Sequence, residues 1–418
     1  MHLSWKSDIL LSMIFSLAVY MALIAVLVYG SVLPGKHSFN ADFLSAEASH
    51  SAKGIAAICI MLHHIAQANG FQESGELSVF KETGFLFVGI FFFYSGYGLL
   101  KSLRTKPLYL QSFFKKRILS VIVPLYVMNG LYAVFNLIAQ AKLSASQWIL
   151  SLSGLVLIND QAWFLIAILI QYAVFYVSFS VSKTDRRALV IITAAVIMQM
   201  AFFIFWGHFA WWAGERNWWT SGSGWSSARW WMQPCALWFQ GEWWVNSTIM
   251  FPVGIAFAMH ETKIVSYFKK SYWIKLAALF ALTAVSVYGA SCALSRMSYW
   301  SEFSSGSMGR LKKTVCLSAQ TAEVFFFVLL TVIFKMKQYA VNGVTRFFGS
   351  ITLEFYLMQR MAIRIWSFVL SNGQLHVCVF ALLVFSTSVV LAVPFHFINT
   401  KILFLLKRGA APGGSAQH

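Results

Sequence analysis

Eleven long apolar segments follow one another along this chain, and they constrain its fold more than any other feature. They lie at residues 9–33, 53–69, 83–103, 118–140, 162–182, 188–206, 243–260, 272–294, 318–336, 346–370 and 376–406. About 20 apolar residues in a helix cross a bilayer, and most of these segments approach that length. The sequence therefore predicts an all-α, polytopic transmembrane helix bundle with about 10–11 spanning helices. A further apolar run at 146–158 is too short to span.

Composition excludes the other broad classes. Only 11% of the 418 residues are charged, whereas a soluble domain carries about a quarter. The same shortage of charge, together with 17% aromatic residues, excludes a disordered chain. The five cysteines have no metal-ligand or redox spacing, and no metal site is expected. Cys292 and Cys316 would pair only if both faced an oxidising side.

Basic residues predict the orientation of the bundle. The formal net charge is +18, and the basic residues lie mostly in short loops, so lipid headgroups and an anionic donor are expected partners rather than nucleic acid. With eleven spans, five loops rich in Lys and Arg lie on the same side of the membrane. The positive-inside rule predicts that this side is cytoplasmic. The N-terminus is then outside. The loop with Arg296, Arg310, Lys312 and Lys313 is an exception. The predicted location is the plasma or inner membrane, as a multi-pass protein.

Ionisable side chains within spans are costly and therefore mark candidate functional positions. They are His63, His64, Glu323, Glu354, Arg360 and Arg364, with Lys53 at the edge of a span. Lys53 and His64 are the most informative pair. Eleven residues separate them, which in a helix is a rotation of about 20° more than three full turns and a rise of about 16 Å. They share one face with Ala57 and Ile60, whereas His63 points about 100° away.

This pair has two interpretations. A cation at the membrane surface attracts a phosphate-bearing donor, and a buried imidazole accepts a proton from a hydroxyl. In the alternative, Lys53 is a topology anchor whose ammonium reaches the interface, and His64 is a hydrogen-bonded packing residue.

The surrounding motifs resemble those of the acyltransferase-3 family of integral membrane acyltransferases. Its members carry Arg or Lys, ten residues and then His in one early helix, which Lys53 and His64 match. Four further stretches are similar and occur in the family's order. They are the aromatic helix at 89–98, the basic loop and Pro-Leu-Tyr at 114–126, Trp-Phe-Leu at 163–165 and the late motif at 348–359. The resemblance covers about 49–405.

The chain departs from the family's pattern in two places. The late motif ends in Gln359 where the family usually has His, and an amide side chain forms hydrogen bonds but does not titrate. An additional helix also precedes the helix with the basic residue and His. The expected organisation is an N-terminal helix and linker (1–48), a membrane acyltransferase domain (49–408) and a disordered tail (409–418). Residues 9–33 either span or act as a signal-like anchor.

The resemblance implies transfer of an acyl group, commonly acetyl from acetyl-CoA, to a hydroxyl of a surface glycan or a lipid-linked saccharide. His64 would be the catalytic base or a transient acyl carrier, with Lys53 at the CoA end. Lys115, Lys116 and Arg117 are candidates for the CoA phosphates, or else topology anchors. Acyl-CoA is a substrate here, and no permanently bound cofactor is expected. The alternatives are a transporter or flippase without chemistry of its own and a structural scaffold.

The other candidates concern substrate binding. Tyr94 and Ser95 either line the acyl site or pack helices through Ser95 and Gly96, and Trp163 opens its helix as in the family. Glu354, Gln359, Arg360 and Arg364 share one segment. The two arginines, four residues apart, either pair with an acid such as Glu323 or orient the acceptor or the leaving thiolate.

Tryptophan is concentrated in one connection. Residues 206–244 hold eleven of the 17 tryptophans, Trp225 among them, interleaved with Gly, Ser and Asn. Such a segment is either part of an aromatic belt at the membrane interface or an outward-facing platform on which sugar rings stack.

Overall fold

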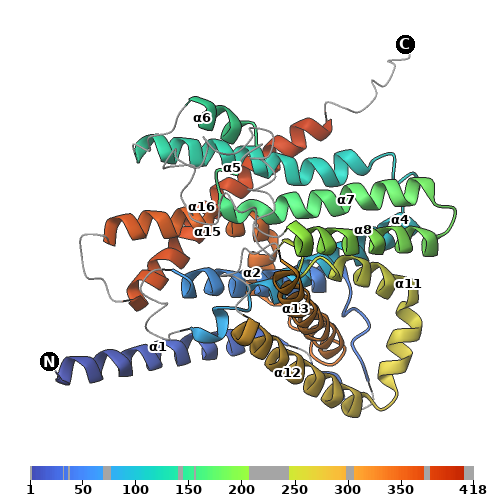
Figure 1. Ribbon diagram of the computed structural model, residues 1–418, viewed down its shortest axis with the longest axis horizontal. Coiled ribbons are helices and arrows are strands. Elements are labelled where there is room, and N and C mark those ends of the chain that lie inside the picture. Colours follow the sequence, from blue (N-terminus) through green and yellow to red (C-terminus); the bar gives the residue numbers. More distant parts are fainter. Residues whose placement is uncertain are drawn as a thin grey trace.

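The computed structural model is a bundle of helices, and it describes residues 2–31, 33–35, 38–68, 77–139, 145–154, 157–206, 244–297, 306–370 and 377–408. The helices run roughly side by side, with α12 and α13 inclined to the rest (Figure 1). In chain order they are α1 (His2–Val28), α2 (Ala46–Ala66), η1 (Ser78–Phe80), α4 (Gly84–Thr105), η2 (Phe114–Ile118), α5 (Leu119–Ile138), α6 (Ala145–Leu152), η3 (Asp160–Ala162), α7 (Trp163–Val181), α8 (Asp185–Trp206), α11 (Met250–Lys269), α12 (Tyr272–Met297), α13 (Ser307–Phe334), α14 (Gly343–Ser350), α15 (Thr352–Leu370) and α16 (Val377–Arg408).

Each of the eleven predicted segments contains one long helix, and 346–370 also includes part of α14, so the all-α membrane fold is confirmed. Within the described residues, seven helices are long and apolar enough to cross a membrane: α4, η2 with α5, α7, α8, α12, α13 and α16. α2, α11 and α15 are more polar. α2 and α15 carry candidate residues noted above, whereas α11 carries His260, Glu261, Lys263 and Lys269. The short run at 146–158 contains the eight-residue α6.

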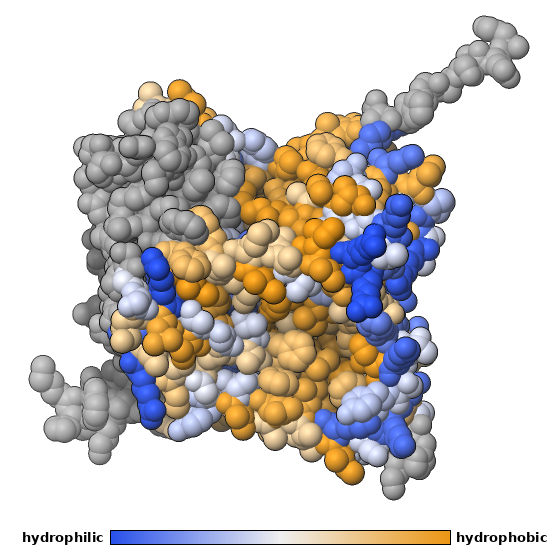
Figure 2. Space-filling model, turned by 45° about the vertical axis from the view of Figure 1, so that its right-hand side comes forward, coloured by the Kyte–Doolittle hydropathy of each residue, from blue (hydrophilic) through white to orange (hydrophobic). Residues whose placement is uncertain are grey.

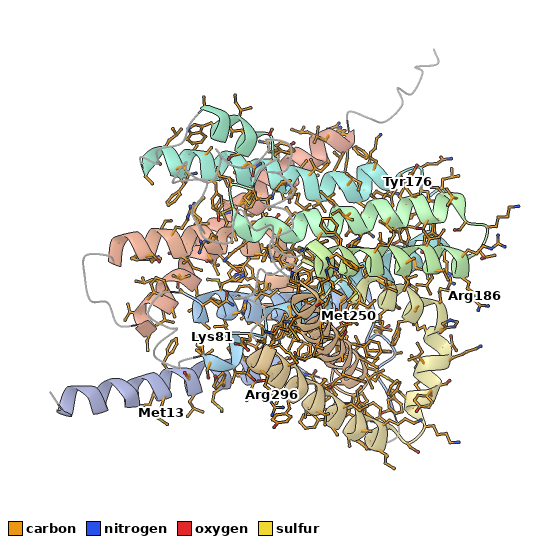
Figure 3. All side chains as sticks on the ribbon, in the orientation of Figure 1. Met13, Lys81, Tyr176, Arg186, Met250 and Arg296 are labelled. Carbon is orange, nitrogen blue, oxygen red and sulfur yellow. The ribbon has the colours of Figure 1, made fainter. Side chains whose placement is uncertain are left out.

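The surface is divided as a bilayer requires. A broad apolar band crosses the molecule, and hydrophilic residues gather at its right-hand margin (Figure 2). Arg186, in the first turn of α8, lies at the right-hand end of the bundle, whereas Lys81 lies toward the left (Figure 3). At the right-hand end, Arg104 pairs with Asp185 at 2.6 Å, which joins the ends of α4 and α8.

The helices that carry the motifs pack against one another. α2 contacts α4, α14 and α15, and α15 contacts α16. One apolar core includes Phe92 and Phe93 of α4, Phe175 of α7 and Phe251 of α11, all fully buried. Cys292 and Cys316 lie on the neighbouring helices α12 and α13, and the structure does not join them in the disulfide considered above.

Candidate active site

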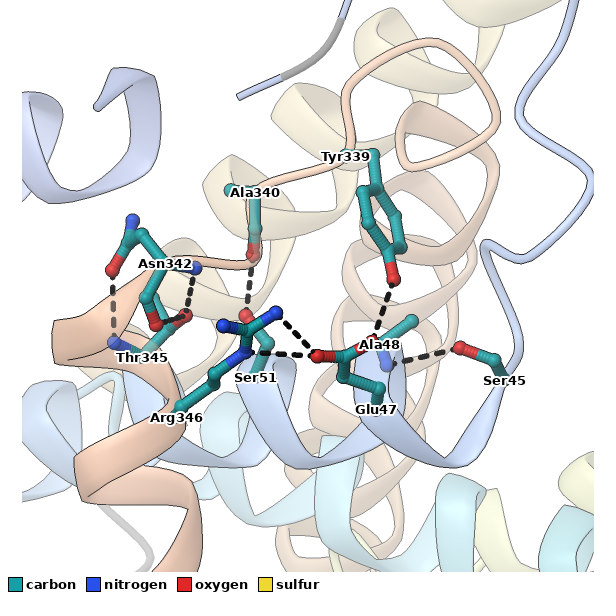
Figure 4. Close-up of polar contacts among 9 residues, drawn as sticks. All are labelled: Ser45, Glu47, Ala48, Ser51, Tyr339, Ala340, Asn342, Thr345 and Arg346. Atoms are coloured by element: carbon teal, nitrogen blue, oxygen red, sulfur yellow. Dashed lines mark hydrogen bonds and ion pairs between the residues drawn. The ribbon is translucent and has the colours of Figure 1, made fainter. Parts of the chain in front are cut away.

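The first turns of α2 are anchored by the segment that leads into α14 (Figure 4). Ser45 caps α2 by accepting a hydrogen bond from the Ala48 amide at 3.2 Å, as N-cap serines do. Glu47 pairs with Arg346 at 2.6 Å, and the Ser51 hydroxyl donates to the Ala340 carbonyl. These contacts hold α2 and α14 together at the end of α2 that carries Lys53.

Two glycines let these helices approach closely. A Cβ on Gly54 would lie 2.6 Å from the Thr345 carbonyl oxygen, and one on Gly349 would lie 2.6 Å from the His50 carbonyl oxygen. Side chains therefore cannot fit at either position without moving the helices apart. Small residues serve this purpose in membrane helix pairs. Gly54 immediately follows Lys53, so this contact fixes the height of Lys53 in the bundle.

A cavity of about 260 Å³ begins beside Lys53 and is enclosed by α2, α4, α5, α7, α14 and α15. Its lining includes Lys53, Ala57, Ile60, Ser95, Phe164 and Tyr356. The face of α2 predicted from the helical period, with Lys53, Ala57 and Ile60 in one stripe, is thus the face that lines the cavity. No residue in the described part of the chain pairs with the Lys53 ammonium.

His64 lies beyond the cavity, one turn of α2 after Ile60. The Tyr356 ring, which lines the cavity, has its centroid 6.2 Å from that of His64 and 6.1 Å from that of Phe164. Tyr356 therefore separates the cavity from the imidazole. The Tyr356 hydroxyl donates to the Gln161 carbonyl, which fixes this ring in place.

The neighbour of His64 in this structure is Gln359 of α15. His64 Nδ1 lies 2.7 Å from Gln359 Oε1. An amide oxygen only accepts hydrogen bonds, so Nδ1 carries the proton and Nε2 of the neutral ring keeps its lone pair. Gln359 is fully buried, and its Nε2 has no hydrogen-bond partner among the residues that the structure describes. The residue that departs from the family's pattern thus orients the imidazole.

His63 points elsewhere, as the helical register predicts. Its Nδ1 donates to the Phe80 carbonyl at 2.8 Å, and its ring packs on Gly84, where a Cβ would lie 2.4 Å from the ring. His63 thus joins α2 to η1 and the start of α4.

The three basic candidates before α5 differ in position. Arg117 is half-buried and donates through Nε to the Tyr109 hydroxyl at 2.8 Å, and its charge acts on Lys53 and Tyr172. Tyr172 lines the cavity, so Arg117 lies near the cavity beside Lys53. Lys115 and Lys116 are exposed.

On α4 and α7 as well, some candidate residues line the cavity and others do not. Ser95 lines the cavity, while the adjacent Gly96 packs on α11, where a Cβ would lie 2.1 Å from the Phe251 carbonyl oxygen. Tyr94 accepts a hydrogen bond from Lys335 instead, outside the cavity lining. On α7, Phe164 lines the cavity, whereas Trp163 packs edge-on against Phe164 at 6.3 Å.

Glu354 lines the cavity, and its contacts come from α16. Asn399 Nδ2 donates to the Glu354 carboxylate at 3.0 Å, and His396 Nδ1 lies 3.3 Å from the same oxygen. Glu323 is buried in α13, and pairing of the two arginines with an acid stays a prediction. The charge of Arg360 acts on His64, and Arg364 lies one turn further along the helix, half-buried.

Several residues that hold α15 in place were not predicted from the sequence. The Leu357 carbonyl of α15 accepts hydrogen bonds from the Tyr132 hydroxyl at 3.0 Å and from Asn159 Nδ2 at 3.1 Å. His396 and Asn399 stand in an otherwise apolar run, and polar residues within a span were the available signal. No sequence signal shows which partner such a residue contacts.

Trp225 lies outside the described residues, so the structure does not place the proposed tryptophan platform. Trp244, at the end of the same connection, is buried and packs near Phe202 with ring centroids 6.2 Å apart. Within the described ranges, no three His, Cys, Asp or Glu side chains are grouped so that they would hold a metal ion.

Comparison with known families adds one finding. The family model for acyltransferase-3, described as an acyltransferase domain, matches residues 47–397. The match begins in the first turn of α2, ends within α16 and includes all the motifs described above. No curated protein and no solved structure matches the chain.

Proposed function

Because the chain belongs to the acyltransferase-3 family and is a multi-pass membrane acyltransferase that transfers groups other than amino-acyl groups, we propose a specific reaction. It transfers an acyl group, with acetyl as the expected one, from acyl-CoA to a hydroxyl of a surface glycan or lipid-linked saccharide. The reaction takes place in the plasma or inner membrane. One observation carries the proposal: a cavity runs from Lys53 to Tyr356, and the ring of Tyr356 lies against His64, whose Nδ1 is engaged by Gln359.

The donor approaches from the basic side of the bundle. Lys53 and Arg117 bind its phosphates through charge-assisted hydrogen bonds. A cavity of about 260 Å³ is smaller than the ~300–1,000 Å³ of sites that enclose a whole drug-sized ligand. The nucleotide therefore stays at the surface, and the thioester arm extends between Ser95 and Phe164 toward Tyr356.

His64 handles the proton of the reaction. Its Nε2 takes the proton from the acceptor hydroxyl as the new C–O bond forms, the C–S bond of the thioester breaks, and the proton passes to the thiolate of CoA. A well-placed general base contributes about 10²–10⁴-fold to such a rate. The products are the acylated saccharide and free CoA.

Gln359 has two parts in this reaction. Its Oε1 holds His64 in the tautomer that leaves Nε2 basic. A buried donor without a partner costs roughly 1–3 kcal/mol, and the Nε2 amide of Gln359 is such a donor in the described structure. In the proposed reaction this Nε2 donates a hydrogen bond to the carbonyl oxygen of the transferred acyl group, where negative charge develops during transfer.

The test is transfer from labelled acetyl-CoA to a saccharide acceptor by the purified protein in lipid nanodiscs. His64→Ala should lower transfer by at least about 10²-fold with the yield of folded protein unchanged. His63→Ala is the matched control, because its contact with Phe80 is structural; it should lower thermal stability and keep most of the activity. A folded His64→Ala variant with normal transfer would overturn the proposal.

A further inference from the structure

A second cavity, of about 820 Å³, lies against a different face of α2 from the cavity beside Lys53. Four other helices, α1, α4, α12 and α13, complete its walls. The lining is almost entirely apolar and includes Leu27 of α1, Ala52 and Ile55 of α2, Phe280 of α12 and Phe327 of α13. We call this space the α1 groove.

Lys335 is the one charged residue in the lining of the α1 groove, and it is 8% exposed. Its ammonium donates to the Ala48 carbonyl at 2.5 Å and to the Tyr94 hydroxyl at 3.2 Å. Both acceptors are neutral, and an ammonium has three N–H groups. Among the described residues no carboxylate pairs with Lys335, and the nearby charge that acts on it is the positive one of Lys53.

A buried cation without an opposing charge is costly, so this position favours an anionic ligand. The other polar side chains at this end are engaged, since Ser51 and Gln338 donate to the carbonyls of Ala340 and Leu27. The two acceptors account for two of the three N–H groups of the Lys335 ammonium, so one N–H remains for a ligand that enters the groove beside it.

The dimensions of the α1 groove match one leaflet of a bilayer. Its lining on α13 extends from Phe327 to Lys335, eight residues or about 12 Å of helix. Half of a bilayer's hydrocarbon core is about 15 Å. The cation lies at the end of α13, on the side of the basic connections, which is the level of lipid headgroups.

We propose that the α1 groove binds one anionic phospholipid from the leaflet on the basic side. An acyl chain fills the space between α1, α12 and α13, and the phosphate lies against Lys335. The lipid also completes the attachment of α1, whose last turn is held by hydrogen bonds from Asn342 to the carbonyls of Val26 and Tyr29, at 2.7 and 2.9 Å. The proposal is independent of the transfer reaction.

The experiment titrates the purified full-length protein in detergent with phosphatidylglycerol and with phosphatidylcholine, and counts bound lipid by native mass spectrometry. The wild type should retain one phosphatidylglycerol in preference to phosphatidylcholine. Lys335→Met should reduce that preference on the order of tenfold, whereas Lys263→Met, which removes an exposed lysine of α11, should not.

A second pair of variants tests the apolar part without disturbing the buried lysine. Ala277 is exposed on α12 and lines the groove, while the adjacent Ala278 is exposed and does not line it. Ala277→Phe should displace the lipid, and Ala278→Phe should bind it as the wild type does. Equal retention of phosphatidylglycerol by Ala277→Phe and the wild type overturns the proposal, as does equal affinity of the wild type for the two lipids.

Discussion

One hydrogen bond determines which nitrogen of His64 carries the proton. Nδ1 donates to Gln359 Oε1, and Nε2 is then the nitrogen with the free lone pair. Neither residue shows this role by itself, because 295 positions separate them in the chain. A glutamine in place of the usual histidine still accepts a hydrogen bond, and this is the part of the role that matters for orientation.

Gln359 variants should therefore change turnover rather than donor affinity. Gln359→Leu removes the acceptor at similar volume and should lower kcat about 10–100-fold, the range that corresponds to losing a hydrogen bond to a group that becomes charged. The KM for acyl-CoA should stay near its wild-type value. Gln359→His restores a nitrogen acceptor and should recover much of kcat. If Leu and His variants behave alike, Gln359 only fills space.

Lys53 should act on the donor. Lys53→Ala is expected to raise the KM for acyl-CoA on the order of tenfold, because a charge-assisted contact to phosphate is lost. Lys53→Arg keeps the charge and the ability to bind phosphate, so most of the activity should remain. Steady-state kinetics with Lys263→Ala as the control for general loss of positive charge measure the effect. An unchanged KM in Lys53→Ala would remove this residue from the donor site.

At the scale of elements, the contact between α2 and α14 positions the site. The sequence predicts one segment at 346–370, which the structure divides into α14 and α15. The separation of α14 from α2 follows from Gly54 and Gly349, which let one backbone lie against the other. α15 continues directly from α14 and carries Tyr356 and Gln359 to the far end of α2. A shift between α2 and α14 therefore changes the distance between His64 and Gln359.

Gly54→Ala should disturb this contact. The added methyl group would meet the Thr345 carbonyl oxygen at 2.6 Å, and overpacking of this kind typically costs about 1–3 kcal/mol. We expect a lower Tm in a detergent thermal-shift assay and a fall in transfer. Gly98→Ala is the matched control on α4, where a Cβ meets nothing within 4 Å. It should leave the Tm unchanged or raise it slightly, and equal losses in both variants would contradict the argument.

At the scale of the whole molecule, charge is distributed by side. The ion pairs Arg104–Asp185 and Lys101–Glu261 tie α4 to α8 and α11 at one end of the bundle. Lys53 lies close enough to Arg117 and to Lys335 for their positive charges to act on one another. The three residues therefore belong to one basic region. The proposed use of a cytosolic, phosphate-bearing donor requires this side to face the cytoplasm.

Cysteine labelling tests that orientation. In a background with Cys235 and Cys292 replaced by serine, Lys183→Cys in the turn between α7 and α8 should react with an impermeant maleimide only after cells are permeabilised. Ser223→Cys, in the tryptophan-rich connection, should react in intact cells. The remaining cysteines of the described chain are buried, which keeps the background low. The opposite pattern would invert the bundle and leave Lys53 on the outer side.

The sequence by itself determined the fold class, the positions of the helices and the stripe of α2 that joins Lys53 to His64. These follow from local physics, since bilayer-length apolar runs and a period of 3.6 residues are readable along the chain. The family motifs also identified Gln359 as a departure before its partner was known.

Only the tertiary structure decided which candidates meet. It joined Gln359 to His64, placed Arg117 rather than Lys115 and Lys116 near the cavity, and paired Glu354 with Asn399 and His396. It also revealed Lys335 as a buried lysine in the lining of an apolar groove. Such pairings depend on how helices distant in the chain rotate and approach one another, and that geometry is set by close packing between side chains whose contacts no local pattern records.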